Sequence, residues 1–215
     1  MDIAFHVNPS QPHQREHGEW FRAGFKRHGI NILVTPNIDQ DADIHIVSGP
    51  HYAKRRWQGS RTILLDRAYY HEEKTGKWAS MDWVSLGWMN ADGGRDFRIG
   101  EGRAKLEPAD CPKSKKSIFL ADFGGPIEHA DTIRLHPNAK HEREPLRTAL
   151  RRHGTAIGYN TTALVTAGLE GLEIVCKSSQ SIMSQGNWLE ILPYADWHFS
   201  EISSGEAIEH LWRSI

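Results

Sequence analysis

The chain has 215 residues, of which 39 % are hydrophobic and 25 % are charged, as in a globular protein that can bury a core. Lysine and arginine number 26 against 27 for aspartate and glutamate, so the formal charge is -1. This balance argues against a protein that coats nucleic acid through a basic surface. The sequence shows neither a run of about 20 apolar residues nor a signal peptide. We therefore expect a cytoplasmic protein with no membrane partner.

The first half alternates short apolar runs with one amphipathic segment. Runs rich in β-branched residues predict strands at residues 3–7, 30–35, 43–48 and 61–66. Between the first two strands, residues 14–28 place apolar side chains on one face and end at Gly29, which predicts a helix closed by a glycine. Strands that alternate with helices are typical of a parallel sheet with covered faces.

The composition changes after residue 69. Tryptophans among glycines and charged residues up to residue 97 predict strands or a loop, and the polar residues 104–116 predict a linker between domains. The alternation then restarts, with strands predicted at 117–121, 132–135, 155–158 and 172–176 and helices at 144–153, 161–169 and 206–212. The predicted fold is α/β, with two small Rossmann-like halves (residues 1–104 and 117–215) and a cleft between them.

The segment 155–165 carries the most informative pattern. Its predicted strand ends at Asn160, and Thr161 and Thr162 open the next helix. Asn160 is a good helix cap, and the amides at the positive end of a helix bind phosphate. A structural cap with no ligand is the alternative.

The neighbouring predicted strands end in similar residues. In a parallel sheet these ends share one edge, where ligands of open α/β sheets bind. Glycines there permit close backbone approach, and cations and hydroxyls donate hydrogen bonds to a diphosphate and a ribose. The candidate nucleotide- and phosphate-binding residues are Gly124, Gly125, Arg134, His136, Asn160, Thr161, Thr162, Lys177 and Ser178.

The order of these features resembles the nucleotide-sugar half of GT-B glycosyltransferases. It is most similar to the capsule-polysaccharide-biosynthesis type and to short phage members of that group. In that type, a His-Pro step and an Asn-Ser/Thr-Thr step precede an Ala-Leu-x-Gly-x-Pro-Val stretch. Here the steps are His136-Pro137 and Asn160-Thr161-Thr162, and the stretch is residues 167–175. The resemblance covers roughly residues 117–215.

The resemblance implies an enzyme that moves a sugar from a nucleotide diphosphate to a hydroxyl, with no cofactor and no metal. Arg134 and His136 would contact phosphate or ribose, and Asn160 to Thr162 would hold the diphosphate. Donors aimed at the growing charge of the leaving group lower the barrier. The acceptor would be a glycan or a hydroxymethylated base in phage DNA, and a phage-encoded enzyme would work in the host cytoplasm. Histidine spacing also predicts no metal site.

Such a transferase needs a base that activates the acceptor hydroxyl, expected on the first half. Asp66, at the end of a predicted strand, is the first candidate, followed by His51 and His6. An ion pair of Asp66 with Arg67 or another nearby arginine is the structural alternative.

Cations beside aromatic rings suggest where an acceptor binds. The candidate acceptor-binding residues are Arg55, Arg56, Trp57, Arg67 and Trp88. Rings stack on sugars or on unstacked bases, and arginines contact phosphate backbones, which favours DNA as a partner. A solvated helix face is the structural alternative for the basic cluster at residues 54–57, and a place in the core is the alternative for Trp83 and Trp88.

Two other functions fit the same pattern. A module that sequesters or senses a nucleotide shares the phosphate-binding edge and lacks only a working base. A hydrolase or epimerase of nucleotide sugars is a third interpretation, because function is not determined by fold.

Overall fold

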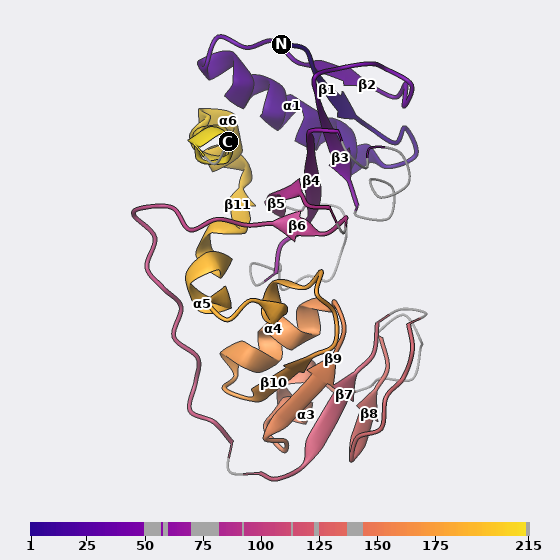
Figure 1. The fold of residues 1–215 in the computed structure, drawn as a ribbon, viewed down its shortest axis with the longest axis vertical. Helices are drawn as coiled ribbons and strands as arrows, with labels where there is room; N and C mark the ends of the chain where they lie inside the picture. The colour runs from indigo at the N-terminus through magenta and orange to yellow at the C-terminus, as the bar shows by residue number, and fades with distance from the viewer. Residues whose placement is uncertain are drawn as a thin grey trace. The chain divides into compact units, whose positions relative to one another are not determined.

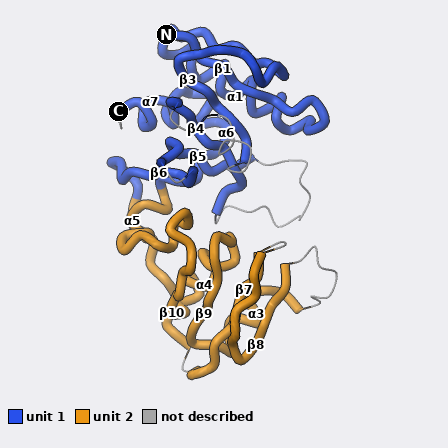
Figure 2. Tube along the Cα trace, turned by 45° about the vertical axis from the view of Figure 1, so that its right-hand side comes forward, with its two compact units in different colours: residues 1–103, 194–215 blue, residues 104–193 orange. Residues whose placement is uncertain are grey.

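The computed structural model describes residues 1–49, 57, 60–69, 82–91, 93–112, 114–122, 125–136 and 144–213. The chain divides into two compact units, shown in Figure 2. Unit 1 comprises Met1–Arg103 and Tyr194–Ile215, and unit 2 comprises Ala104–Pro193. Within the described part of the chain, no helix has the length and apolar character needed to span a membrane.

Unit 1 is built on a mixed sheet with the strand order β11-β5-β4-β3-β1-β2, and β6 pairs with β5 (Figure 1). Its strands are β1 (Ile3–His6), β2 (Leu33–Thr35), β3 (Ile44–Ser48), β4 (Thr62–Arg67), β5 (Trp83–Met89), β6 (Arg95–Asp96) and β11 (Asp196–His198). β2, β1, β3 and β4 are parallel, whereas β5 is antiparallel to β4, β6 and β11. The parallel part confirms the α/β class.

Three helices pack on one face of this sheet: α1 (Pro12–Arg27), α6 (Phe199–Ser204) and α7 (Glu206–Arg213). Alternate strand residues such as Phe5 and Ile46 share a core with Phe21 and Ile202 from the helices. α1 and α6 approach very closely at Gly24, where a Cβ would lie 2.0 Å from the Ile202 carbonyl oxygen. Since successive strand residues alternate between faces, the other residues of β1, β3 and β4 point to the opposite face.

Unit 2 contains a four-stranded sheet in which all neighbours are parallel, in the order β10-β9-β7-β8. The strands are β7 (Ser117–Leu120), β8 (Thr132–Arg134), β9 (Thr155–Gly158) and β10 (Glu173–Cys176). The helices are α3 (Leu146–Leu150), α4 (Thr162–Leu169) and α5 (Trp188–Ile191), with 3-10 turns η2 (Ile182–Ser184) and η3 (Leu192–Tyr194). α4 packs on β9 and β10, and the missing side chain of Gly158 makes room for Leu164. The strands lie where the sequence predicted them.

The division into units differs from the predicted one. Residues 194–215 belong to unit 1, because Trp197, Ile202 and Leu211 complete its core. Residues 104–116 belong to unit 2 rather than to a free linker. There the Leu106 and Ala109 amides donate to the carbonyls of Leu189 and Leu169. The cleft between two halves stays a prediction.

Candidate functional site

The carboxyl edge of the unit 2 sheet gathers residues from four separate segments. Asp122 follows β7, His136 follows β8, Asn160 follows β9 and Lys177 follows β10. Because the four strands are parallel neighbours, these ends lie along one edge that spans about 14 Å at the usual strand spacing. The parallel pairing therefore confirms that the predicted segments share an edge. The predicted residue Gly124 lies outside the described residues.

The N-terminus of α4 differs from the prediction at its cap. Thr161 is the N-cap, and its Oγ1 accepts a hydrogen bond from the Ala163 amide at 3.3 Å. Asn160 was predicted as the cap, and this is wrong because Asn160 still belongs to the preceding turn, where its amide donates to Asp122 Oδ2 at 3.1 Å. Thr162 is the first helical residue. One protein carboxylate therefore already lies at the positive end of this helix.

Lys177 lies beside a second carboxylate. Its Nζ is 3.9 Å from Glu128 Oε2, and both side chains are exposed by about two fifths, at 42 % and 38 %. The Tyr159 hydroxyl donates to Glu128 Oε1 at 2.6 Å. This hydrogen bond, together with desolvation and the carboxylate charge, raises the pKa of Tyr159. Exposed ion pairs are weak, so little free energy is needed to separate Lys177 from Glu128.

Three of the remaining predicted residues of this edge form local hydrogen bonds. Arg134 Nη2 donates to the Glu144 carbonyl at 2.8 Å, which fixes its guanidinium against the segment before α3. The Gly125 amide donates to the Asp122 carbonyl at 3.3 Å and closes a turn. Ser178 Oγ accepts from the Gln180 amide at 3.2 Å. His136 is half-buried at the end of β8.

In unit 1, the candidate base Asp66 takes part in an ion pair. Its Oδ2 lies 3.7 Å from Arg95 Nη2, and its Oδ1 accepts from the Arg67 amide at 2.8 Å. The structural alternative is therefore present, with Arg95 rather than the Arg67 side chain as the partner. The Asp66 side chain is still 36 % exposed, so solvent and solutes can reach the carboxylate.

Arg67 and Asp66 are adjacent in β4 and so point to opposite faces of the sheet. Burial and the charge of Arg67 lower the pKa of His13 on α1, and Glu16 partly opposes them. Arg67 therefore acts on the helix-covered side. Asp66 and Arg67 therefore do not share a face of the sheet, and the acceptor-binding role of Arg67 stays a prediction.

The two described tryptophans that were predicted to bind an acceptor are used in packing. Trp57 is 5 % exposed, packs against Val47 and Leu64, and lies 4.8 Å from the His6 ring. Trp88 Nε1 donates to the Leu211 carbonyl at 3.0 Å. The contact of Trp88 matches the structural alternative for that ring, whereas the burial of Trp57 does not match the solvated face that was its alternative. His51, Arg55 and Arg56 lie outside the described residues.

A buried histidine pair was not predicted from the sequence. His6 Nε2 lies 3.0 Å from His45 Nδ1, and His6 Nδ1 lies 3.2 Å from the Asn37 carbonyl oxygen. Because a carbonyl only accepts, His6 carries its proton on Nδ1 and accepts from His45 Nδ1–H. Burial lowers the pKa of His45, with Asp41 opposing, so His45 is favoured in its neutral form. The one feature of the sequence that points to a buried histidine is the position of His45 between two isoleucines of a predicted strand.

A cavity of about 370 Å³ in unit 1 lies between the segment 98–103, the β11 region and α7. Tyr194 and His210 stack in its wall with ring centres 5.4 Å apart, and a Cβ at Gly100 would lie 2.7 Å from the Tyr194 ring. Burial and the nearby charge of Arg103 lower the pKa of His210. In the described part of the chain, no group of three or more histidine, cysteine, aspartate or glutamate side chains is placed to hold a metal ion.

No protein-family model matches the chain, and a search of curated proteins finds no match. The similarity to GT-B glycosyltransferases therefore stays a hypothesis based on the sequence motifs.

Proposed function

We propose that unit 2 binds the diphosphate of a nucleotide-activated sugar and that the protein transfers the sugar to a hydroxyl acceptor. One observation supports this proposal above the others. The parallel order of β8, β7, β9 and β10 brings Arg134, His136, Thr161 and Lys177 to one sheet edge, beside the N-terminus of α4. Open α/β sheets bind their ligands at this edge.

The chemistry of the edge suits a departing nucleoside diphosphate. Charge grows on the diphosphate as the bond to the sugar breaks, so a cation and a helix N-terminus aimed at it stabilise the transition state. Lys177 can supply the cation once phosphate replaces Glu128, because the pair at 3.9 Å is exposed. A ligand oxygen can accept from the Asn160 amide at this helix end only if it displaces Asp122 Oδ2, which accepts from that amide now.

Unit 1 would supply the acceptor side. Asp66 is an accessible carboxylate at the carboxyl end of β4, and a general base must accept the proton of the acceptor hydroxyl. A glycan and a hydroxymethylated base in DNA are the two acceptor classes to be tested. A base in a duplex must leave the stack before it reacts.

A nucleotide-binding module without turnover is the second candidate. The Asp66–Arg95 pair is compatible with it, because an ion pair is a structural use of the carboxylate that requires no turnover. Both candidates share the unit 2 edge, and they differ in whether the bound sugar is transferred.

A panel of UDP-, GDP-, ADP- and CMP-sugars separates these candidates. Calorimetry measures binding, and nucleotide release is followed with water alone, with an oligosaccharide, and with hydroxymethylated DNA. If one of the acceptors accelerates nucleotide release, the result supports the transferase. If a nucleotide sugar binds and no nucleotide is released, the result supports the binding module. Failure of every nucleotide sugar to bind overturns both. An absence of duplex binding at both low and moderate salt removes DNA from the acceptors.

A further inference from the structure

We infer that Arg95 is a positioning residue that holds the Asp66 carboxylate ready for the acceptor hydroxyl, an inference that rests on the proposed transferase function. Arg95 lies in β6 at the antiparallel side of the unit 1 sheet, and Asp66 lies at the end of β4. Their closest atoms, Arg95 Nη2 and Asp66 Oδ2, are 3.7 Å apart.

The Arg95 guanidinium is fixed by contacts that do not involve Asp66. It lies over the rings of Tyr69 and Phe97, with its central carbon 5.0 and 5.4 Å from their centres. Its Nη2 donates to the Tyr69 hydroxyl at 2.8 Å, and its Nη1 lies 3.5 Å from the Ser85 carbonyl oxygen. The residue is 8 % exposed. A buried arginine with several partners is a rigid support for a neighbouring carboxylate.

Tyr69, which supports Arg95, is itself anchored. Its amide donates to Oδ2 of the buried Asp196 at 2.7 Å. Burial raises the pKa of Tyr69 to about 12, so its hydroxyl stays neutral and accepts from Arg95. The anchor comes from β11, which belongs to the C-terminal segment of unit 1.

Strand register places two carboxylates and one hydroxyl in a single row. Ser85 in β5 is opposite Asp66 in β4 and opposite Asp196 in β11, so all three side chains point to the same face. Among the described residues, Ser85 Oγ is fully buried and has no hydrogen-bond partner. Buried hydroxyls without a partner are rare and mark places where a water or a ligand group binds. The Ser85 hydroxyl therefore offers an unused hydrogen-bond donor and acceptor directly beside Asp66.

The Arg67 amide donates to one oxygen of Asp66, and the fixed charge of Arg95 lies 3.7 Å from the other oxygen. A carboxylate held in this way does not need to reorient when a hydroxyl arrives, and prior orientation of reacting groups lowers the barrier. Its 36 % exposure leaves room for that hydroxyl. Arg95 thus acts on the reaction through Asp66.

A double-mutant cycle with Asp66→Asn and Arg95→Gln tests this inference, using nucleotide release from the donor that the wild type turns over. We expect Asp66→Asn to lower kcat about 100-fold and Arg95→Gln about tenfold, with the donor KM nearly unchanged because the donor binds unit 2. The double variant should be no slower than Asp66→Asn, since Arg95 acts only through that carboxylate. Tyr69→Phe removes the hydroxyl that orients Arg95 and should cost severalfold in kcat.

Arg103→Gln is the matched control, because Arg103 is another arginine of unit 1 with an acidic partner and ring contacts. It should lower stability and leave kcat per folded molecule unchanged. Circular dichroism checks whether Arg95→Gln folds. If it does not fold, Tyr69→Phe replaces it in the double-mutant cycle and is combined with the wild type and with Asp66→Asn. If the kcat losses of the two single variants add in the double variant, or if Arg95→Gln changes the donor KM and leaves kcat unchanged, the role of Arg95 is overturned while the transferase proposal stands. A wild type that binds donor but releases no nucleotide overturns the transferase proposal and this inference with it.

Discussion

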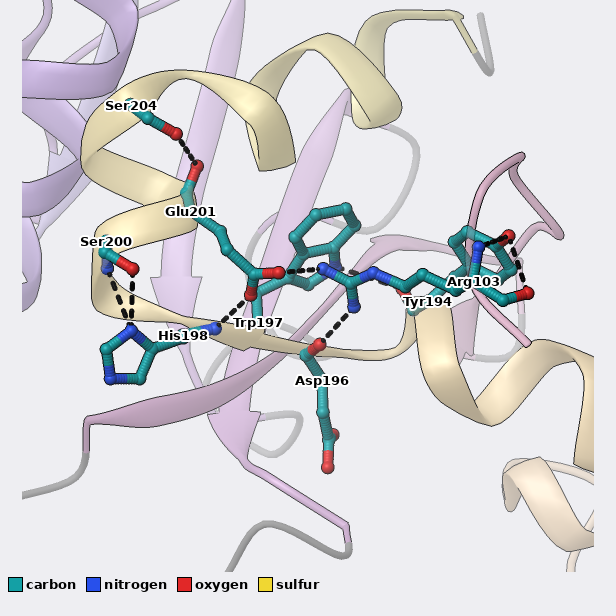
Figure 3. Close-up of polar contacts among 8 residues, drawn as sticks. All are labelled: Arg103, Tyr194, Asp196, Trp197, His198, Ser200, Glu201 and Ser204. Carbon is teal, nitrogen blue, oxygen red and sulfur yellow. Dashed lines mark hydrogen bonds and ion pairs between the residues drawn. The ribbon is translucent and has the colours of Figure 1, made fainter. Parts of the chain in front are cut away.

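Arg103 and Glu201 form an ion pair within unit 1, although 98 positions of sequence separate them. Figure 3 shows the Arg103 guanidinium against Trp197, with its central carbon 4.0 Å from the ring centre. Its Nη1 also donates to the Asp196 carbonyl at 2.9 Å, and its amide donates to the Tyr194 hydroxyl at 2.9 Å. Arg103 is the last residue of unit 1 before unit 2, and Tyr194 is the first one after it. The chain therefore leaves and re-enters unit 1 at one anchored place.

Glu201→Gln tests this anchor. The side chains of Arg103 and Glu201 are only 19 % and 24 % exposed, and removal of one partner leaves a half-buried charge without its counterion. We expect the free energy of unfolding to fall by about 2 kcal/mol. Glu19→Gln, which breaks the exposed pair with Arg22, is the control and should change stability by less than about 0.5 kcal/mol. Urea unfolding measures both, and equal effects would contradict the anchoring role.

Gly24→Ala tests the close packing of α1 on α6. A Cβ at Gly24 would lie 2.0 Å from the Ile202 carbonyl oxygen, so the two helices must separate or the core must shift. We expect a loss of about 2 kcal/mol in unfolding free energy. Gly186 has open space where its Cβ would be, and Gly186→Ala should be within about 0.5 kcal/mol of the wild type. A Gly24→Ala protein as stable as the wild type would show that this contact is not tight.

The parallel strands and the helices α1, α3, α4 and α7 could be predicted because they depend on local patterns. Strand β9 and helix α4 have the expected bounds to within one residue, since a β-branched run and an Asn-Thr-Thr step mark their junction. The shared edge of unit 2 followed from parallel pairing alone. The C-terminal segment could not be assigned in this way. Which sheet β11 joins depends on the long-range pairing of Asp196 with Ser85, which no local pattern encodes.

The site was predicted less completely than the fold. Sequence identifies Asp66 as a residue at a strand end, but its partner Arg95 is brought to it by the antiparallel pairing of β4, β5 and β6. The cap of α4 is Thr161 rather than Asn160, and the Asn160 amide is instead engaged by Asp122, which follows another strand. Contacts between charged side chains on different strands therefore could not be predicted from composition and spacing.

Acid should destabilise unit 1. The pKa values of His13, His45 and His210 are lowered in the folded state, mainly by burial. When the pH falls through the ordinary histidine value of 6.5, the unfolded chain takes up protons that the folded chain does not, so stability declines toward the folded-state pKa values. Urea unfolding followed by tryptophan fluorescence from pH 7.5 to about 5 measures this slope. Stability that is constant or rises on acidification would contradict the neutral buried histidines.

Lys177→Met should weaken nucleotide-sugar binding. If phosphate replaces Glu128 on Lys177, loss of the ammonium removes a charge-assisted contact and raises Kd about tenfold. Lys105→Met is the matched control, because Lys105 forms a similar exposed pair with Glu190, 3.5 Å away in the same unit, and follows none of the four strand ends. Calorimetry with the best-binding nucleotide sugar measures both variants. Equal affinities would remove Lys177 from the phosphate site.

Glu128→Gln should have two effects that share one cause. Removing the carboxylate releases Lys177 from its internal partner, so a nucleotide diphosphate should bind a few times more tightly, in line with the small free energy of an exposed pair. The same change removes the charged acceptor of the Tyr159 hydroxyl, so the pKa of Tyr159 should fall toward its ordinary value of 10.0. Ultraviolet titration of phenolate, with Tyr159→Phe subtracted, detects this fall without any ligand. Glu190→Gln should alter neither quantity, because Glu190 pairs with Lys105 and not with Lys177. A lowered pKa of Tyr159 with unchanged nucleotide affinity would mean that Glu128 and the ligand do not compete, and that the phosphate lies elsewhere on the sheet edge.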